Sequence, residues 1–247
     1  MEDQRFTIIE HLAELRSRLV RSAVYVAVGT AICWLGYGYI DSFLLGPTKH
    51  VLKQFGGELA YYNLADAFMV KMQVSIICGV MVAVIPLMSE AWLFIKPALK
   101  RNERKVFYAL GPMILVLFVF GAATALWVMP AAIRWFASYS RQQGIPLRQN
   151  TKQLVTFVAM MCLAFGGAFQ LPTILMALGK VGLIRSRDMI AYWRHAIVAL
   201  AVIAAVITPS NDAPTMILMA LPLIVLYGLS IILVRIVEPR GARSGDR

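Results

Sequence analysis

Long apolar runs without charges alternate along the chain with short, charged connections. Five runs hold at least 18 consecutive uncharged residues, namely 22–40, 72–89, 106–133, 153–179 and 213–234. Because a helix needs about 18–20 apolar residues to cross a bilayer, each run predicts a spanning helix. A sixth run, 196–211, has 16 residues and predicts a shorter helix, about 24 Å long at 1.5 Å per residue. The pattern therefore predicts an all-α, polytopic membrane protein with six transmembrane helices.

The charges of the connections predict which side of the membrane each one faces. With a cytoplasmic N-terminus, the cytoplasmic pieces are 1–21, 94–106, 180–194 and 235–247, and they hold 17 of the 24 Lys and Arg residues. The positive-inside rule then places both termini in the cytoplasm, which requires an even number of spans. The external connection 134–152 goes against the rule, because it carries four cations and no acid. The net charge of +11 thus follows from topology, and no nucleic-acid partner is expected.

The composition indicates a compartment and excludes several classes of function. Hydrophobic residues make up 60% of the chain, above the roughly 45–50% of soluble domains. Asp3, Glu10 and Glu14 interrupt the first residues, which argues against a cleaved signal peptide and is typical of a prokaryotic inner-membrane protein. The 3 cysteines lie in apolar runs without a CxxC spacing, so neither a disulfide nor a metal site is predicted. Nucleotide-binding and hydrolase motifs are also missing from the sequence, which predicts a protein without enzymatic activity or cofactor.

Residues 1–238 are expected to form one transmembrane domain, followed by a flexible cytoplasmic tail over 239–247. The domain begins with an amphipathic pattern over 7–19, which predicts a helix that lies on the membrane surface and leads into a first span ending near Tyr39. Its apolar residues recur at helical spacing: Ile8, Leu12, Leu15 and Leu19. Glu14 stands four residues before Arg18, a spacing that permits a weak ion pair on one helix face.

The first external segment, 41–67, predicts a turn followed by a short helix. Gly46 and Pro47 would turn the chain, residues 48–55 would form the helix, and Asp66 would cap the helix after it.

The second and fourth predicted spans contain polar residues and helix-breaking residues. Glu90 ends the second span, and two interpretations stay open: it lies near the cytoplasmic interface, or it has a functional role. In the fourth span Gly166 and Gly167 permit close helix approach, and Pro172 is expected to kink the helix. Gln170 is a buried amide that needs hydrogen-bond partners.

Two acids on the cytoplasmic face, Glu14 and Glu103, suggest a binding site. Each lies among basic and apolar neighbours. A carboxylate can accept a forked, two-bond contact from a guanidinium, a geometry that lysine reproduces poorly. The pair therefore favours a receptor for an arginine-containing peptide. The alternative is that Glu103 only pairs with Lys100 or Arg104.

Four stretches, in order, resemble one family. HLAELRSRL at 11–19 resembles the N-terminal HLxELRxRL signature of TatC, the polytopic subunit of the twin-arginine protein translocase. FIKPALKRNER at 94–104 resembles the FxxPALxxxER of that family's first cytoplasmic loop. FGGAFQLP at 165–172 is similar to its FGxxFExP, and TPSND at 208–212 to the turn between its two short final spans. Five residues are expected to have structural roles: His11, Leu12, Pro47, Pro97 and Pro172. Four more are expected to be polar or turn residues that face partner helices: Gln170, Thr208, Pro209 and Asp212.

The resemblance implies that folded precursors with a twin-arginine signal peptide dock at the cytoplasmic face. Glu14 and Glu103 would receive the arginine pair, and Arg16 and Phe94 would shape the site. It also implies single-span TatA- and TatB-type partners along the outer helices, surrounding membrane lipid, and several copies of the chain in one hetero-oligomeric complex. Export would be driven by the proton-motive force. Where the family often has glutamate this chain has Gln170, which cannot titrate.

A small-solute or ion transporter is the main alternative, with Glu90, Gln170 and Asp212 as a midplane site. An internal inverted repeat and a denser set of intramembrane charges would favour it, and the sequence has neither. An intramembrane enzyme would need paired catalytic groups, which the sequence also lacks.

Overall fold

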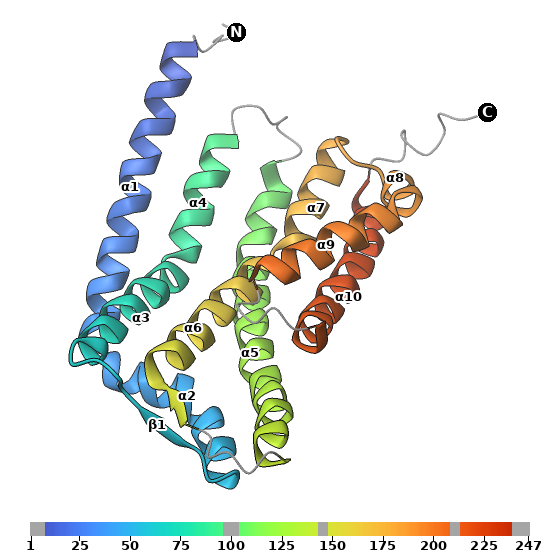
Figure 1. Cartoon of the computed structure of the whole chain (residues 1–247). Helices are drawn as coiled ribbons and strands as arrows, with labels where there is room; N and C mark the ends of the chain where they lie inside the picture. The colour runs from blue at the N-terminus through green and yellow to red at the C-terminus, as the bar shows by residue number, and fades with distance from the viewer. Residues whose placement is uncertain (1–7, 96–103, 143–147, 208–212, 239–247) are drawn as a thin grey trace, which may run out of the picture.

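The computed structural model describes residues 8–95, 104–142, 148–207 and 213–238 (Figure 1). Its helices are α1 (Ile8–Leu35), α2 (Tyr37–Gln54), α3 (Asp66–Val82), α4 (Val84–Ile95), α5 (Arg104–Gln142), α6 (Thr151–Ala168), α7 (Leu171–Val181), α8 (Ser186–Ala191), α9 (Trp193–Ile207) and α10 (Ala213–Val237). Two short strands, β1 (Glu58–Ala60) and β2 (Arg148–Asn150), complete the described elements. The start of α1 and the end of α4 lie at one end of the molecule, and α2 and β1 lie at the other (Figure 1).

The helices that could cross a membrane follow the predicted runs. Four are long and apolar enough: Leu12–Leu35, Gly111–Trp135, Thr151–Val181 and Met219–Val237. α3 and α4 make a fifth if they count as one span, since they pass the same test together despite a bend of 50°. A shorter apolar helix covers Trp193–Val206. The predicted all-α membrane fold is confirmed, whereas the sixth span and the cytoplasmic termini stay predictions.

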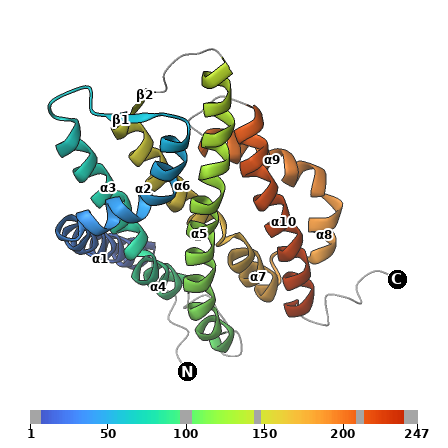
Figure 2. The same ribbon diagram turned by 90° about the horizontal axis from the view of Figure 1, so that it is seen from below.

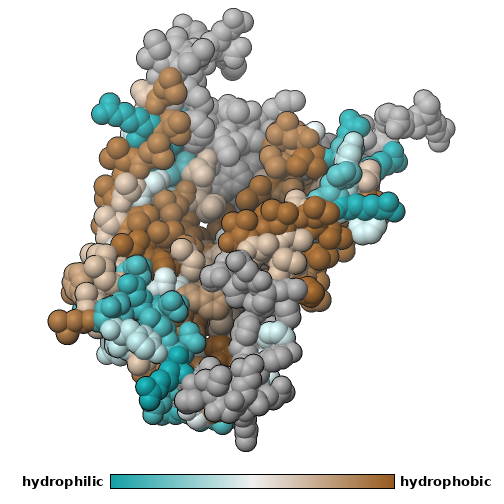
Figure 3. Space-filling model, viewed as in Figure 1, coloured by the Kyte–Doolittle hydropathy of each residue, from teal (hydrophilic) through white to brown (hydrophobic). Residues whose placement is uncertain are grey.

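Apolar side chains cover the middle of the molecular surface. Figure 3 shows this brown zone between hydrophilic patches at the lower left, over the α2 and β1 end, and at the upper right, over α8. α6 is the central helix, enclosed by α2, α3 and α5 (Figure 2). In the most apolar 18-residue window of Thr151–Val181 56% is buried, against 11% in that of Leu12–Leu35, so most of the α1 surface lies outside the helix bundle.

The helix predicted over 7–19 leads into the first span as expected, whereas its place on the membrane surface stays a prediction. From Ile8 onward these residues are the first turns of the continuous helix α1. Its leucine stripe is exposed (Leu19 by 61%), and the polar side chains of Glu14 and Arg18 face α4 instead. Amphipathic spacing defines two faces but cannot tell which one meets protein. In a membrane the apolar face can turn to lipid, which is as apolar as a protein core.

The corner after α1 also differs from the prediction. The first span ends at Leu35, and α2 already begins at Tyr37. Pro47 therefore lies inside a helix and does not make a turn. The missing N–H costs a helical hydrogen bond to the carbonyl of Phe43, a residue on the exposed side of α2.

Burial and the nearby Asp41 carboxylate raise the pKa of Tyr37, whose hydroxyl donates to Asp41 Oδ1 at 3.3 Å.

The segments 41–67 and 134–152, both predicted to be external, meet in a short parallel pairing that the sequence did not predict. β1 pairs with β2 in the register Glu58↔Arg148 to Ala60↔Asn150. Asp66 does not cap α3, because its side chain accepts from the backbone N–H of Asn63 at 3.1 Å and from Lys152 Nζ at 3.3 Å. The pairing brings cations of the segment 134–152 next to acids of the segment 41–67.

Breaks and close approaches shape the remaining spans. α6 ends at Ala168 and α7 starts at Leu171, so the predicted break occurs just before Pro172. A Cβ on Gly166 would lie 2.6 Å from the Phe118 ring, whereas one on Gly167 would meet nothing within 4 Å. Only the first of the two glycines is therefore needed for close approach.

Candidate functional site

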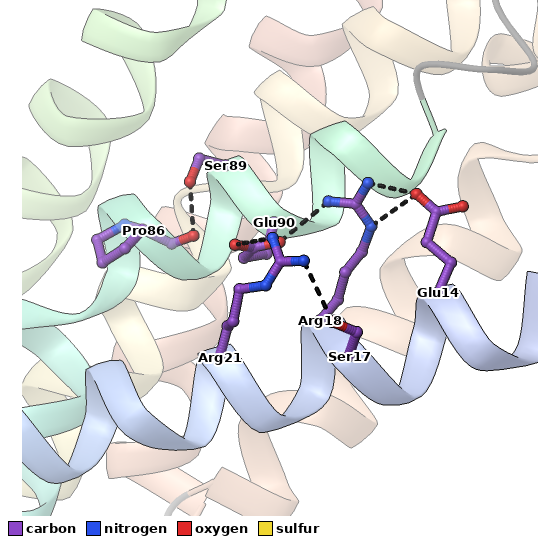
Figure 4. Close-up of polar contacts among 7 residues, drawn as sticks. All are labelled: Glu14, Ser17, Arg18, Arg21, Pro86, Ser89 and Glu90. Carbon is purple, nitrogen blue, oxygen red and sulfur yellow. Dashed lines mark hydrogen bonds and ion pairs between the residues drawn. The ribbon is translucent and has the colours of Figure 1, made fainter.

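Charged side chains of α1 and α4 form a cluster at the end of the molecule where α1 begins (Figure 4). Glu14, Arg18 and Arg21 follow one another at helical spacings of four and three, which places them on one face of α1. Glu90 projects toward them from α4 (Figure 4). The cluster of Glu14, Arg18, Arg21 and Glu90 is called the charge cluster below.

Arg18 links the two acids of the charge cluster. Its Nη1 donates to Glu90 Oε2 at 3.0 Å and its Nε donates to Glu14 Oε1 at 3.0 Å. Its Nη2 contacts the same oxygen of Glu14. Arg21 adds an ion pair from Nη1 to Glu90 Oε1 at 3.5 Å, and its Nη2 donates to Ser17 at 3.1 Å. The predicted pairing of Glu14 with Arg18 is thus confirmed, and a second acid joins it.

Burial differs sharply within the charge cluster. The Glu90 side chain is 7% exposed and the Glu14 side chain 26%, whereas Arg21 is more than half exposed. A buried carboxylate is expensive unless it is paired, so Glu90 needs both arginines. Glu90 is thus paired inside the protein, and both interpretations of it, a place near the cytoplasmic interface and a functional role, stay predictions.

One oxygen of Glu14 has no partner among the described residues. Both contacts from Arg18 go to Oε1, and Oε2 points away from Arg18 (Figure 4). Within the described part of the chain no hydrogen bond or ion pair reaches that oxygen. Glu14 is therefore a carboxylate that binds one guanidinium through a single oxygen in the described part of the chain.

The other residues predicted for the binding site lie on α1, on α4 or outside the described residues. Arg16 is exposed on α1, as is Leu12, and His11 precedes them on the same helix. Phe94 belongs to the last turn of α4. Glu103 and Pro97 lie outside the described residues. The helices on either side of them, α4 and α5, end and begin at the end of the molecule where α1 starts (Figure 1).

Apart from the charge cluster, Gln170 is a polar residue buried deep in the helix bundle. It is 2% exposed, and its Nε2 donates to the carbonyls of Ile114 at 3.0 Å and Gly166 at 3.4 Å. Its Oε1 has no partner among the described residues. The amide ties α5 to the break between α6 and α7. Thr208, Pro209 and Asp212 lie outside the described residues.

The link between Arg18 and Glu90 was missed by the sequence reasoning. The two residues are 72 positions apart, and no local pattern connects them. A signal did exist, because an acid at the end of an apolar run must find a cation or water. It did not say which of the four cationic residues of the first 21 would be that partner.

Comparisons with known proteins agree with one another. The family model described as "Sec-independent protein translocase protein (TatC)" matches residues 10–222. The TatC protein of Carboxydothermus hydrogenoformans is 32% identical over 100% of both chains. The chloroplastic TATC protein of Arabidopsis thaliana is 34% identical over 92% of this chain and 65% of its own length.

A crystal structure described as "Twin Arginine Translocase Receptor- TatC" has the same fold. Its TM-score is 0.80 at 31% identity, with 92% of this chain and 99% of that chain covered. A second crystal structure of that receptor, in DDM, gives a TM-score of 0.81. Matched in sequence from residue 10 to residue 222 and in fold over most of its length, the chain belongs to the TatC family of Sec-independent protein translocase proteins.

Proposed function

We propose that this chain is the receptor of the twin-arginine translocase and binds twin-arginine signal peptides of folded precursors at its cytoplasmic face. As a member of the TatC family it is a membrane component of that translocase and not an enzyme. The residues proposed to receive the arginine pair are Glu14 and Glu103, with Arg16 and Phe94 beside them.

The half-occupied carboxylate of Glu14 carries this proposal. Its side chain is 26% exposed, and one oxygen already accepts two N–H groups of a guanidinium. The kind of group that a twin-arginine peptide would supply, a guanidinium, is thus already bound there from Arg18, and the second oxygen points away from Arg18 (Figure 4). A planar guanidinium with several donors fits such a carboxylate better than the single ammonium of lysine.

The proposal is tested by measuring peptide affinity with the purified full-length protein in detergent. A twin-arginine signal peptide should bind, and the twin-lysine peptide of otherwise identical sequence should bind at least about tenfold more weakly, since hydrogen bonds to charged groups contribute about 1.5–3 kcal/mol. Glu14→Gln and Glu103→Gln should each weaken twin-arginine binding to a similar extent. The matched control is Glu58→Gln, which removes one exposed carboxylate from β1. Equal binding of both peptides, or unchanged binding in either glutamate variant, contradicts the proposal.

The proposed receptor role extends to the membrane in which the chain lies and to the proteins with which it assembles. We place the chain in the prokaryotic inner membrane with both termini in the cytoplasm, in several copies within one hetero-oligomeric complex. TatA- and TatB-type single-span proteins would pack along the outer helices, where α9 and α10 expose apolar side chains such as Val206 and Val225. The proton-motive force would drive export of the docked precursor.

A further inference from the structure

Glu90 has no role in the receptor site proposed above, yet it is the most buried member of the charge cluster. Its side chain is 7% exposed, so a signal peptide outside the protein cannot reach it. Both of its oxygens face arginines of α1: Oε2 accepts from Arg18 at 3.0 Å and Oε1 pairs with Arg21 at 3.5 Å. Glu90 can therefore act on cargo only through these two side chains.

The arrangement around Arg18 is unusual for an arginine beside a carboxylate. A free arginine and carboxylate commonly form two parallel bonds, one to each oxygen. Here Nη1 is held by Glu90, and the two remaining contacts, from Nε and Nη2, converge on Oε1 of Glu14. Oε2 of Glu14 is left pointing away (Figure 4). While Nη1 of Arg18 is bonded to Glu90, Arg18 therefore contacts only one of the two oxygens of Glu14.

We propose that Glu90 is a positioning residue for signal-peptide recognition, because by anchoring Arg18 it keeps one oxygen of Glu14 available to a guanidinium of the cargo. This inference rests on the proposed function. Without the anchor, Arg18 turns toward Glu14 and bonds to both of its oxygens. The chain's own arginine then competes with the arginine of the signal peptide for the same carboxylate.

Arg21 completes the arrangement from the exposed side. Two acids and two bases make the charge cluster neutral overall, so its attraction for cations of any shape is small. Recognition at Glu14 then depends on the direction of hydrogen bonds more than on net charge. This favours the fixed donor geometry of a guanidinium over the point charge of an ammonium.

The test is a set of four variants in which twin-arginine peptide affinity is measured on the purified full-length protein. Glu90→Gln removes the anchor and should weaken binding about tenfold, the effect of one lost charge-assisted hydrogen bond. Adding Arg18→Gln to it removes the competitor, so the double variant should recover most of that loss. Asp188→Asn, which neutralises an exposed carboxylate on α8, is the matched control and should bind like the unmodified protein.

A structural role alone would give a different pattern. If Glu90 only holds α1 against α4, the double variant binds as weakly as Glu90→Gln or more weakly, and the inference is overturned. Glu90→Asp keeps the charge but withdraws the carboxylate by one methylene. It serves as the second variant if Glu90→Gln does not fold, with the same loss expected.

The inference and the proposed function can fail separately. If Glu14→Gln leaves peptide binding unchanged, the receptor site itself is wrong. If Glu14→Gln weakens binding while Glu90→Gln and Glu90→Asp bind like the unmodified protein, the receptor site stands and the positioning role of Glu90 is rejected.

Discussion

Single glycines fix the distance between α1 and α3. A Cβ on Gly29 would lie 2.6 Å from the carbonyl oxygen of Gly79, and one on Gly79 would lie 2.5 Å from the backbone nitrogen of Thr30. Backbone atoms cannot move aside as a side-chain end can. Each glycine is therefore required by the crossing, not by its own backbone conformation.

Gly29→Ala should lower the free energy of unfolding by about 1–3 kcal/mol, the cost of overpacking a close contact. Gly228→Ala in α10 is the matched control, because a Cβ there meets nothing within 4 Å. That change should be neutral or slightly stabilising, since alanine favours a helix. The measurement is thermal unfolding of both variants in detergent. Equal Tm values for the two would show that the crossing can relax.

Gln170 is the other residue whose role can be isolated. Its Nε2 is satisfied by two backbone carbonyls, while its Oε1 has no partner in the part of the chain that the structure describes. We expect Gln170→Leu to weaken assembly with the single-span partners more than it weakens signal-peptide docking. Pull-downs of partner and of peptide from the same preparation compare the two losses. Equal losses would contradict a role of Gln170 in assembly.

At the scale of elements, a buried ion pair joins α3 to α6 beside the β1–β2 pairing. Asp66 is 2% exposed and receives Lys152 Nζ at 3.3 Å. Next to it Thr156 donates to Gln73 Oε1 at 3.2 Å. These contacts continue the β1–β2 pairing along α3 and α6, so the two strands and the two helices form one unit.

Removal of the cation should loosen that unit, since a buried carboxylate without its partner is destabilising. Lys152→Met keeps the length of the side chain and should lower Tm, whereas Gln153→Met, at the exposed neighbouring position, should not. Thermal unfolding of the two variants provides the comparison. A Tm for Lys152→Met equal to that of Gln153→Met would mean that Asp66 is supported by Asn63 alone.

The spans could be predicted from the sequence because the bilayer imposes a length that an uncharged run either reaches or does not. The connections between the spans, such as β1, β2 and the start of α2, could not be predicted in this way. β1 and β2 are three residues each, too short to show an alternating pattern. α2 starts one residue after Gly36, where composition gives no stop signal beyond a glycine. Helix ends at such corners depend on tertiary packing.

The candidate site was predicted in the same partial way. Glu14 was identified because its chemistry and its spacing to Arg18 are local. Glu90 and Arg18 meet only because α4 packs beside α1, so their contact belongs to the tertiary structure. The pairing of Glu14 with Glu103 in one binding site stays a prediction, because Glu103 lies outside the described residues.

For the whole molecule, the orientation in the membrane gives a prediction about access. Exposed positions exist at both ends: Glu58 on β1 and Arg187 on α8. The native Cys33, Cys78 and Cys162 are buried, so their background labelling should be low. In intact cells a membrane-impermeant maleimide should label Glu58→Cys and not Arg187→Cys, and in inverted vesicles the reverse. Labelling of Arg187→Cys from outside would overturn the cytoplasmic assignment of both termini.

The most direct test of the receptor site is to map where a signal peptide lies on the full-length protein. A twin-arginine peptide with a photoreactive residue beside the arginine pair is crosslinked in membranes, and the attachment points are identified by mass spectrometry. Crosslinks should fall on the first turns of α1, around Glu14, and on the segment 96–103, and they should be lost with the twin-lysine peptide. Crosslinks at the α2 and β1 end, or an unchanged pattern with twin-lysine, would contradict guanidinium binding by Glu14.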